Sequence, residues 1–513
     1  MGQFRGTFAL NTTRQGYKAL AGILCLIVGG GLFYFSGRRY SEKRYIVDAA
    51  SCRMQVLAIE RKDLPPASEL GSVVLFHGIS ANNIIMDYLG RAFAEQGLRV
   101  FIPDLPGHGR SPGPFLPEQA EACSASLVRG LAARGMINPE RTILAGHSMG
   151  GAIALRVAEK FRPAGVIAIS PAPMQVAHGV IHENLLFNGV PKILPNTRII
   201  VGQFEHPGLK LNAADLVPPD SPSIQYVVVP WATHVSILFS PTAVREAQAW
   251  AANVLGLTGE PRMPNRLNLV ACLLGLVGIL LFAGPLIREL VANKPPADFS
   301  AGPAVPRWRG ALAIVLLSLL LIHVWPHFKL LKSIHLFEGD YLASFFLLLG
   351  FAIVLLHFGI ARKLAPVAPG VFAGSAVAAL LLHLLFTGWF ELTATSAWLT
   401  LQRWVRFPLL AVAAFLFLYG LEVLAGPAAS WRSRFPFWFS LVVLSWLALA
   451  FGVYFLKSGE ILLVLLSPYF ALFFLFSGMG VHLVRRLTGS ATAAAVFGAI
   501  LLAGFCLVLF PVT

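Results

Sequence analysis

Apolar stretches long enough to cross a lipid bilayer follow one another along the second half of the chain. A helix needs roughly 20 apolar residues to span about 30 Å of hydrocarbon. A further stretch, ALAGILCLIVGGGLFYF (residues 19–35), lacks a small-x-small cleavage site at its end and is interpreted as an uncleaved anchor. Backbone polar groups in hydrocarbon must be paired within their own segment, so we expect each apolar stretch to be a helix. The stretches give nine helical spans in all. The eight later ones lie near residues 267–287, 310–328, 341–360, 371–390, 407–425, 437–456, 461–483 and 491–511.

The region between the first and second spans has a different composition. The whole chain is 56% hydrophobic and only 13% charged, yet residues 36–268 hold 22 Lys and Arg and 18 Asp and Glu, as a soluble domain does. We therefore predict an N-terminal membrane anchor (1–36), a globular domain (37–262) and a polytopic region of about eight helices (263–513).

The net charge of +15 is distributed as membrane topology requires. Only +4 of it belongs to residues 36–268, and the rest lies in short loops between apolar stretches, which argues against a nucleic-acid partner. Nine basic residues lie in loops on the side of the N-terminus and five in the opposite loops. This bias predicts a multi-pass protein of a bacterial cytoplasmic membrane with its globular domain outside the cytoplasm, although basic residues flanking that domain, such as Arg38 and Arg266, favour the reverse.

Within the globular domain, apolar strand-like runs alternate with helical segments. Continuous apolar strands separated by helices indicate a parallel sheet buried on both faces, so the fold class expected is α/β, doubly wound and mostly parallel. Helices are expected near 84–97, 117–135, from 149, and near 242–256. The strand-like runs are SVVLFHG (72–78), RVFIPDLPG (99–107), RTILAGHS (141–148), GVIAIS (165–170), TRIIVGQFE (197–205) and IQYVVVP (224–230).

A G-x-S-x-G motif, Gly146 to Gly150, separates one of these strands from the helix that follows. A serine at such a sharp strand-to-helix turn has strained backbone angles, and its neighbours must be small for strand and helix to approach. The hydroxyl then projects above the sheet at a helix N-terminus. Ser148 is therefore predicted to be a nucleophile rather than a simple helix cap.

The sequence resembles the α/β-hydrolase superfamily, and most closely its lysophospholipase and monoacylglycerol-lipase branch, which includes proline-type aminopeptidases. The resemblance covers roughly residues 70–256 and does not extend to the polytopic half. It rests on LFHGIS (75–80), FIPDLPGHGRS (101–111), AGHSMGG (145–151), GQFE (202–205) and THVSIL (233–238), in the order and spacing of the family.

The resemblance implies a triad of Ser148, His234 and an acid. The family has aspartate in a G-x-x-D motif, whereas this chain has Glu205 at that position, with Asp215 as the alternative acid. The oxyanion hole would consist of the backbone N–H groups of Ile79 and Met149.

Four further positions carry structural expectations from the family motifs. His77 and Gly78 are expected to shape the oxyanion loop, and Asp104 with His108 to form a hydrogen-bonded turn.

These features predict a membrane-integral serine esterase, lysophospholipase-like, that cleaves a lipid or acyl ester through an acyl-enzyme and needs no cofactor or metal. The stretch PMQVAHGVIHENLLFNGV (173–190) would supply only a small lid. The alternatives are a peptidase or acyltransferase using the same triad, and a non-catalytic membrane sensor or transporter with a hydrolase-like binding domain. The sequence carries no signal for an oligomeric state.

Polar residues outside the motifs are expected to be structural. The five cysteines have no metal-ligand spacing: Cys52 and Cys123 lie in the globular domain, the others in apolar stretches. Ionisable residues within spans are often functional, and the candidates of this chain are His323, His357, His383 and Glu422. For His323 and His327, four residues apart, polar contacts between helices or to headgroups are expected rather than a metal site.

Overall fold

The computed structural model divides the chain into two compact units. The sheet unit comprises Leu32–Leu269, Phe390–Ala397 and Pro511–Thr513, and the helical unit comprises Met1–Gly31, Val270–Trp389 and Trp398–Phe510. The structure describes residues 2–49, 52–63, 71–174, 186–219, 221–258, 262–291, 305–324, 331–426, 431–456 and 460–513.

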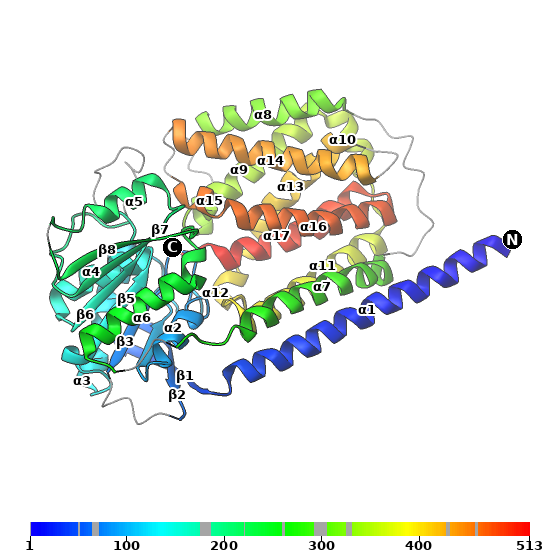
Figure 1. Ribbon diagram of the computed structural model, residues 1–513. Helices are drawn as coiled ribbons and strands as arrows, with labels where there is room; N and C mark the ends of the chain where they lie inside the picture. The colour runs from blue at the N-terminus through cyan, green and yellow to red at the C-terminus, as the bar shows by residue number, and fades with distance from the viewer. Residues whose placement is uncertain are drawn as a thin grey trace. The chain divides into compact units, whose positions relative to one another are not determined.

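The sheet unit is built on one eight-stranded sheet with the order β1-β2-β4-β3-β5-β6-β7-β8 (Figure 1). All pairs from β4 to β8 are parallel, while β1 with β2 and β2 with β4 are antiparallel. The predicted α/β class with a mostly parallel sheet is therefore confirmed. The strands are β1 (Tyr40–Ala49), β2 (Cys52–Arg61), β3 (Ser72–Phe76), β4 (Arg99–Pro103), β5 (Thr142–His147), β6 (Gly165–Ile169), β7 (Thr197–Gly202) and β8 (Ile224–Val229).

Helices cover both faces of the sheet, which explains why its central strands are apolar throughout. Val73, Ile143 and Ile167 belong to a core that also contains residues of α2 and α6. The alternating residues Val74 and Leu144 are equally buried but point to the opposite face, where α3 packs on α4. The helices are α2 (Asp87–Ala94), α3 (Pro117–Ala133), α4 (Met149–Phe161), α5 (Pro207–Ala214) and α6 (Pro241–Leu255).

An antiparallel hairpin, β1 with β2, extends the sheet at its first edge and was not among the predicted strands. A disulfide joins Cys52, the first residue of β2, to Cys123 of α3, with a Cα–Cα distance of 5.5 Å. Both cysteines are buried. The bond therefore ties the edge hairpin to a helix that lies 71 residues away in sequence.

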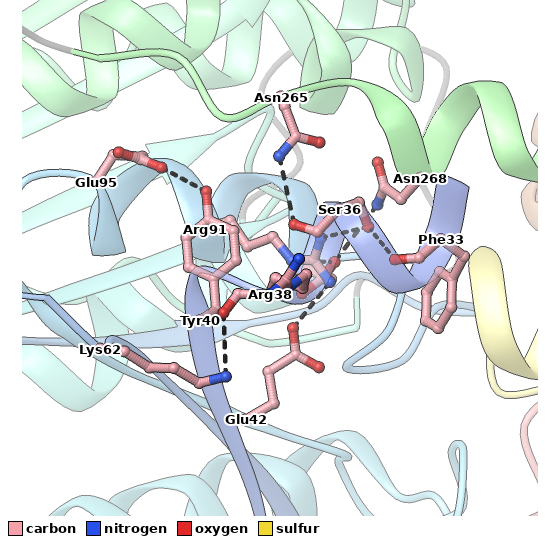
Figure 2. A network of polar contacts seen from close by, with 11 residues as sticks. Phe33, Ser36, Arg38, Tyr40, Glu42, Lys62, Arg91, Glu95, Asn265 and Asn268 are labelled. Atoms are coloured by element: carbon pink, nitrogen blue, oxygen red, sulfur yellow. Dashed lines mark hydrogen bonds and ion pairs between the residues drawn. The ribbon is translucent and has the colours of Figure 1, made fainter. Parts of the chain in front are cut away.

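A buried polar network surrounds Arg91 of α2 (Figure 2). Its guanidinium forms ion pairs with Asp87 at 2.9 Å and Glu42 at 2.8 Å, and it donates a hydrogen bond to Ser36 Oγ. Asn268 donates to the same Asp87 carboxylate at 3.5 Å. These contacts join β1, α2 and the two ends of the Leu32–Leu269 segment within the sheet unit.

Nine helices among the described residues are long and apolar enough to cross a membrane, counting the C-terminal part of α1 (Gly2–Gly37). They lie where the nine apolar stretches predicted them, apart from residues 325–328, which are outside the described ranges. The later eight are α7 (Leu267–Val291), α8 (Arg307–Val324), α9 (Gly339–Leu356), α11 (Pro369–Thr393), α13 (Phe407–Ala425), α14 (Trp431–Phe455), α16 (Ser467–Thr488) and α17 (Ala491–Leu509). The short helices between them are α10 (Phe358–Leu364), α12 (Leu401–Trp404) and α15 (Ile461–Leu465).

Candidate active site

Ser148 lies at a sharp turn between β5 and α4, as the motif predicted. Its backbone angles, φ 54° and ψ −119°, are in a region that residues with a side chain rarely adopt. A Cβ at Gly146 would lie 2.1 Å from the Gly150 oxygen, and one at Gly150 would lie 2.2 Å from the Phe76 oxygen. Any side chain at either glycine would therefore displace the turn that presents the serine.

Three side chains of the predicted triad form one hydrogen-bonded chain. His234 Nε2 lies 3.0 Å from Ser148 Oγ, and His234 Nδ1 lies 2.8 Å from Glu205 Oε2. The Glu205 side chain is fully buried, that of His234 is 13% exposed, and Ser148 is 7% exposed. The carboxylate is thus fully shielded from solvent, while the serine and histidine keep a small exposed fraction.

The ionisation of Glu205 fixes the proton positions in this chain. Burial is the largest single effect and opposes its ionisation, but several opposing effects together outweigh burial. They are the hydrogen bond of His234 and its charge when protonated, followed by the Ser170 hydroxyl and by a hydrogen bond from the backbone N–H of His206, the last at 3.0 Å. The pKa of Glu205 therefore lies below its ordinary value. An ionised carboxylate only accepts, so Nδ1 of His234 carries the proton and Nε2 accepts from the Ser148 hydroxyl.

The alternative acid is not part of this arrangement. Asp215 is exposed and caps the C-terminal end of α5. The carboxylate that contacts His234 Nδ1 is that of Glu205, which follows β7 by three residues. A loop after β7 therefore accommodates a glutamate at the position where the family has aspartate.

The loop that would supply one oxyanion donor passes directly over the nucleophile. A Cβ at Gly78 would lie 3.1 Å from Ser148 Cβ, so glycine is needed for this approach. His77 holds the loop, since its Nε2 accepts from Leu105 N–H and its Nδ1 donates to the Gly78 oxygen. Burial lowers the pKa of His77 to about 4, so the ring is neutral at pH 7. The loop leads to Ile79.

The second predicted oxyanion donor, Met149, is the first residue of α4 and is fully buried. Its N–H belongs to the first turn of the helix, where amides have no partner within the helix and the helix dipole favours negative charge. Gly151 and Ala152 donate their N–H groups to the Ser148 oxygen, which starts the helix immediately after the nucleophile.

The PGHGRS segment forms a hydrogen-bonded turn. Asp104 is fully buried, and its two carboxylate oxygens accept from the backbone N–H groups of Asn83 and Arg110. Burial raises the pKa of Asp104 to about 6 despite these bonds. His108 bonds the Pro106 oxygen at 3.0 Å and packs on the His77 ring. Both residues support neighbouring loops.

His147, the variable residue before the serine in the motif, has a contact that sequence reasoning missed. Its Nε2 donates to the backbone oxygen of His234 at 2.7 Å. Burial, followed by the effect of His234, lowers the pKa of His147 to about 3, so the ring stays neutral. A polar ring in an otherwise apolar strand was the only signal for this role.

A shallow, largely apolar depression lies beside the backbone of Ser148 and has no room even for a water molecule. Its wall includes Ala172, whose N–H donates to the Ser148 oxygen at 2.9 Å. Most of the stretch predicted to form a lid, residues 175–185, lies outside the described residues. The other lining residues are Pro171, Pro173, Met174, Val190, Asn212, Ala213 and Leu216.

In the helical unit, the ionisable residue Glu422 is completely buried and forms ion pairs. Its Oε2 lies 2.6 Å from Arg434 and 3.4 Å from Arg485, and Arg434 also contacts His482 at 3.0 Å. Glu422 is one of the ionisable residues within spans that the sequence singled out as candidates, and here it makes ion pairs. The described ranges contain no group of three or more His, Cys, Asp or Glu residues placed to bind a metal.

Comparisons with known proteins agree with the fold and the motifs. Residues 67–215 match the model of the family described as serine aminopeptidase, S33. An uncharacterized protein of Mycobacterium tuberculosis is 32% identical over 90 residues, which is 18% of this chain and 25% of that protein. The esterase YjfP of Escherichia coli is 37% identical over 51 residues, 10% of this chain and 19% of the esterase. The matches thus span a quarter or less of these relatives.

Solved structures also resemble the chain. An alpha-beta serine hydrolase homologue from Coxiella burnetii is 17% identical, with 41% of this chain and 96% of that one covered and a TM-score of 0.33. An α/β serine hydrolase without a lid from Xanthomonas campestris is 16% identical, with coverages of 43% and 97% and a TM-score of 0.33. The family match over residues 67–215 and the mostly parallel sheet thus identify an α/β-hydrolase-like domain similar to the serine aminopeptidase S33 family, in a chain that also has a region of long apolar helices.

Proposed function

We propose that this protein is a membrane-integral serine hydrolase that cleaves a carboxylic ester of a lipid or other acylated molecule. The observation that carries the proposal is the continuous hydrogen-bonded chain from Ser148 through His234 to Glu205. A serine hydroxyl is a weak nucleophile until an adjacent base takes its proton. In this chain the base lies 3.0 Å from the hydroxyl, and a buried carboxylate orients it.

The reaction proceeds in two halves. Ser148 Oγ attacks the acyl carbon while His234 Nε2 takes its proton, and the Glu205 carboxylate stabilises the resulting imidazolium through Nδ1–H. The C–O bond to the leaving alcohol then breaks, and His234 protonates that alcohol. Water, activated by the same histidine, attacks the acyl-serine ester, and the acid is released as the proton returns to Ser148.

Negative charge develops on the carbonyl oxygen in both halves. We assign its stabilisation to the backbone N–H groups of Ile79 and Met149. Two features support this role: Gly78 brings the first loop against Ser148, and Met149 begins α4. Donors held in place before the reaction contribute more than donors that must reorganise during it.

An acyl substrate is supported by apolar surface around the triad. Phe204, next to Glu205, is 54% exposed, and Trp231, close to His234, is 82% exposed. Their rings lie 5.8 Å apart. Exposed apolar groups at a site favour an apolar ligand.

The assignment is tested with a fluorophosphonate probe, which labels activated serines. Ser148→Ala should lose all labelling while the protein still inserts and folds, and Ser126→Ala, a serine of α3 outside the site, should label like the parent. Undiminished labelling of Ser148→Ala would refute the proposal.

A peptidase or an acyltransferase could use the same triad, and the S33 family description favours the peptidase among these alternatives. The hydrolase, the peptidase and the acyltransferase are distinguished by measuring turnover of aryl esters, monoacylglycerols and aminoacyl amides. Each substrate is measured with and without an alcohol acceptor. We expect ester hydrolysis to be fastest. Faster amide cleavage would identify a peptidase, and acyl transfer to the alcohol an acyltransferase. A Ser148 that reacts with no probe would favour a non-catalytic sensor or transporter.

We further propose that the nine apolar helices cross a membrane and that the catalytic domain lies outside the cytoplasm. The disulfide between Cys52 and Cys123 supports this orientation, since such bonds persist in oxidising compartments. Thr513, on the same side after nine spans, should then react with an impermeant thiol reagent in intact cells once changed to cysteine. Labelling only after permeabilisation would reverse the orientation.

A further inference from the structure

The oxyanion loop ends at a residue whose hydrogen bonds reach a distant part of the chain. Asn82 is 3% exposed and lies three residues after Ile79. Its Oδ1 accepts from the N–H groups of Ile84 at 3.1 Å and of Ser396 at 3.0 Å. Its Nδ2 donates to Thr395 Oγ1 at 2.7 Å. Both acceptor positions of the amide oxygen are therefore used.

The partners of Asn82 come from the polytopic half of the sequence but belong to the sheet unit. The segment Phe390–Ala397 begins in the last turn of α11 and is part of the same compact unit as the triad. A second contact from this segment is the ion pair of Glu391 with Arg110 at 2.5 Å. Arg110 N–H in turn bonds Asp104, which also holds the N–H of Asn83.

A third contact comes from the Pro511–Thr513 segment. Val512 donates its N–H to the Gly107 oxygen at 3.0 Å and accepts from Phe115 N–H at 2.6 Å. Gly107 has φ +75°, and a Cβ there would lie 2.4 Å from the Val512 oxygen. Two separate segments thus bind the end of the oxyanion loop at Asn82 and the turn that contains Gly107 and Arg110.

The oxyanion loop needs such support because it is strained. Ser80 follows Ile79 and has φ +59°, which costs a non-glycine residue free energy that the surroundings must offset. Upstream, His77 holds the loop, and downstream Asn82 and Asn83 hold it. If the downstream end relaxed, the Ile79 N–H would move away from the developing oxyanion.

We propose that Asn82 is a positioning residue for hydrolysis, and that the Phe390–Ala397 segment completes the active site by holding the oxyanion loop through it. The inference rests on the proposed function, because it assumes an oxyanion at Ile79. In this role the Phe390–Ala397 segment, which comes from the polytopic half of the sequence, keeps the backbone N–H of Ile79 in place for catalysis.

The test compares Thr395→Val with Thr395→Ser in the full-length protein, using an aryl ester. Valine has nearly the shape of threonine but leaves Asn82 Nδ2 without its acceptor, whereas serine keeps the hydroxyl. We expect Thr395→Val to lower kcat about 10-fold and Asn82→Ala about 100-fold, with KM changed less than about two-fold. Thr395→Ser should restore most of the rate.

Inhibitor affinity separates positioning from a general effect on folding. A trifluoromethyl ketone forms a tetrahedral oxyanion on the serine, so its affinity should fall in proportion to kcat across the variants. A matched control is Asn138→Ala, because Asn138 Oδ1 accepts from Glu140 N–H in the same local pattern, but in an exposed turn before β5. This control should leave kcat unchanged.

The outcomes distinguish the two proposals. If Ser148→Ala abolishes turnover but Thr395→Val keeps the parent kcat, the positioning role is refuted and the hydrolase stands. A kcat loss in Thr395→Val that serine does not restore, or that leaves ketone affinity unchanged, also refutes it. Turnover that survives Ser148→Ala would refute the proposed function itself. If Asn82→Ala does not fold, the valine and serine pair decides alone.

Discussion

Removing the disulfide should destabilise the sheet unit by a predictable amount. The variant is Cys52→Ala combined with Cys123→Ala. The bond closes a loop with a sequence separation of 71 residues. Loop-closure entropy then gives roughly 15 cal/mol/K, or about 4.4 kcal/mol at 25 °C. For a unit of this size, each kcal/mol shifts Tm by roughly 2–4 °C, so the midpoint should fall by roughly 9–18 °C.

Residual fluorophosphonate labelling after brief heating measures this midpoint, because the label reports on the active-site serine alone. Reducing the parent protein during heating should bring its midpoint down to that of the variant, and reductant should not affect the variant. Changing Cys272 and Cys506, two cysteines of the helical unit that are not part of this disulfide, should leave the midpoint where it is.

Two results would refute the reasoning at different steps. If the bond is present in the purified parent, yet the midpoint of the variant lies within about 2 °C of it, the entropic magnitude is wrong. If mass spectrometry finds both thiols free in protein taken directly from cells, the oxidising location is wrong.

Further predictions concern the acid and His147. Glu205→Gln should lower kcat by several orders of magnitude, because the imidazolium loses its counter-charge. Glu205→Asp should lower kcat less, and Asp215→Asn should keep kcat within a few-fold of the parent. An inactive Asp215→Asn together with an active Glu205→Gln would instead identify Asp215 as the acid of the triad. His147→Phe removes the donor to the His234 oxygen and should lower kcat about 10-fold. His147→Gln keeps an N–H at this position, so its kcat should fall less. Equal rates of hydrolysis in the two variants would contradict this role of His147. The pKa of His147 is lower in the folded than in the unfolded protein, so its contribution to the free energy of unfolding is fully present above pH 6.5 and is lost as the pH falls. At pH 4 the free energy of unfolding should be lower by about 3 kcal/mol on this account. Thermal melts should therefore show a larger acid-induced loss of stability in the parent than in His147→Gln, and parallel pH profiles would disprove the assignment.

Features with a local sequence signal were predictable. The apolar runs gave the parallel strands, since strands buried on both faces must be apolar throughout, and the motif turn depended on glycines whose Cβ atoms would collide with backbone. The β1–β2 hairpin was missed because edge strands carry charges: Lys43 and Arg44 resembled the basic flank of a membrane anchor.

Long-range contacts had no such signal. Nothing in the spacing of Asn82 or Thr395 indicates that residues 313 positions apart are hydrogen-bonded. Similarly, Arg434 and Arg485 resembled loop charges that set topology, yet both are buried and pair with Glu422. Pairing of this kind depends on tertiary packing, which a single sequence does not reveal.

The sheet unit is assembled from three separate segments of the chain, and this affects its biosynthesis. Leu32–Leu269 leaves the ribosome first, and Ser396 and Val512 follow roughly 130 and 240 residues later. At about 5–20 residues per second, roughly 6–50 s separate the main segment from these partners. During that interval Asn82 and Gly107 lack their partners from the later segments. If the protein acts as proposed, the nascent chain therefore carries Ser148 before Asn82 is bonded to its later partners, and we expect full hydrolytic competence only once synthesis has reached the last helices.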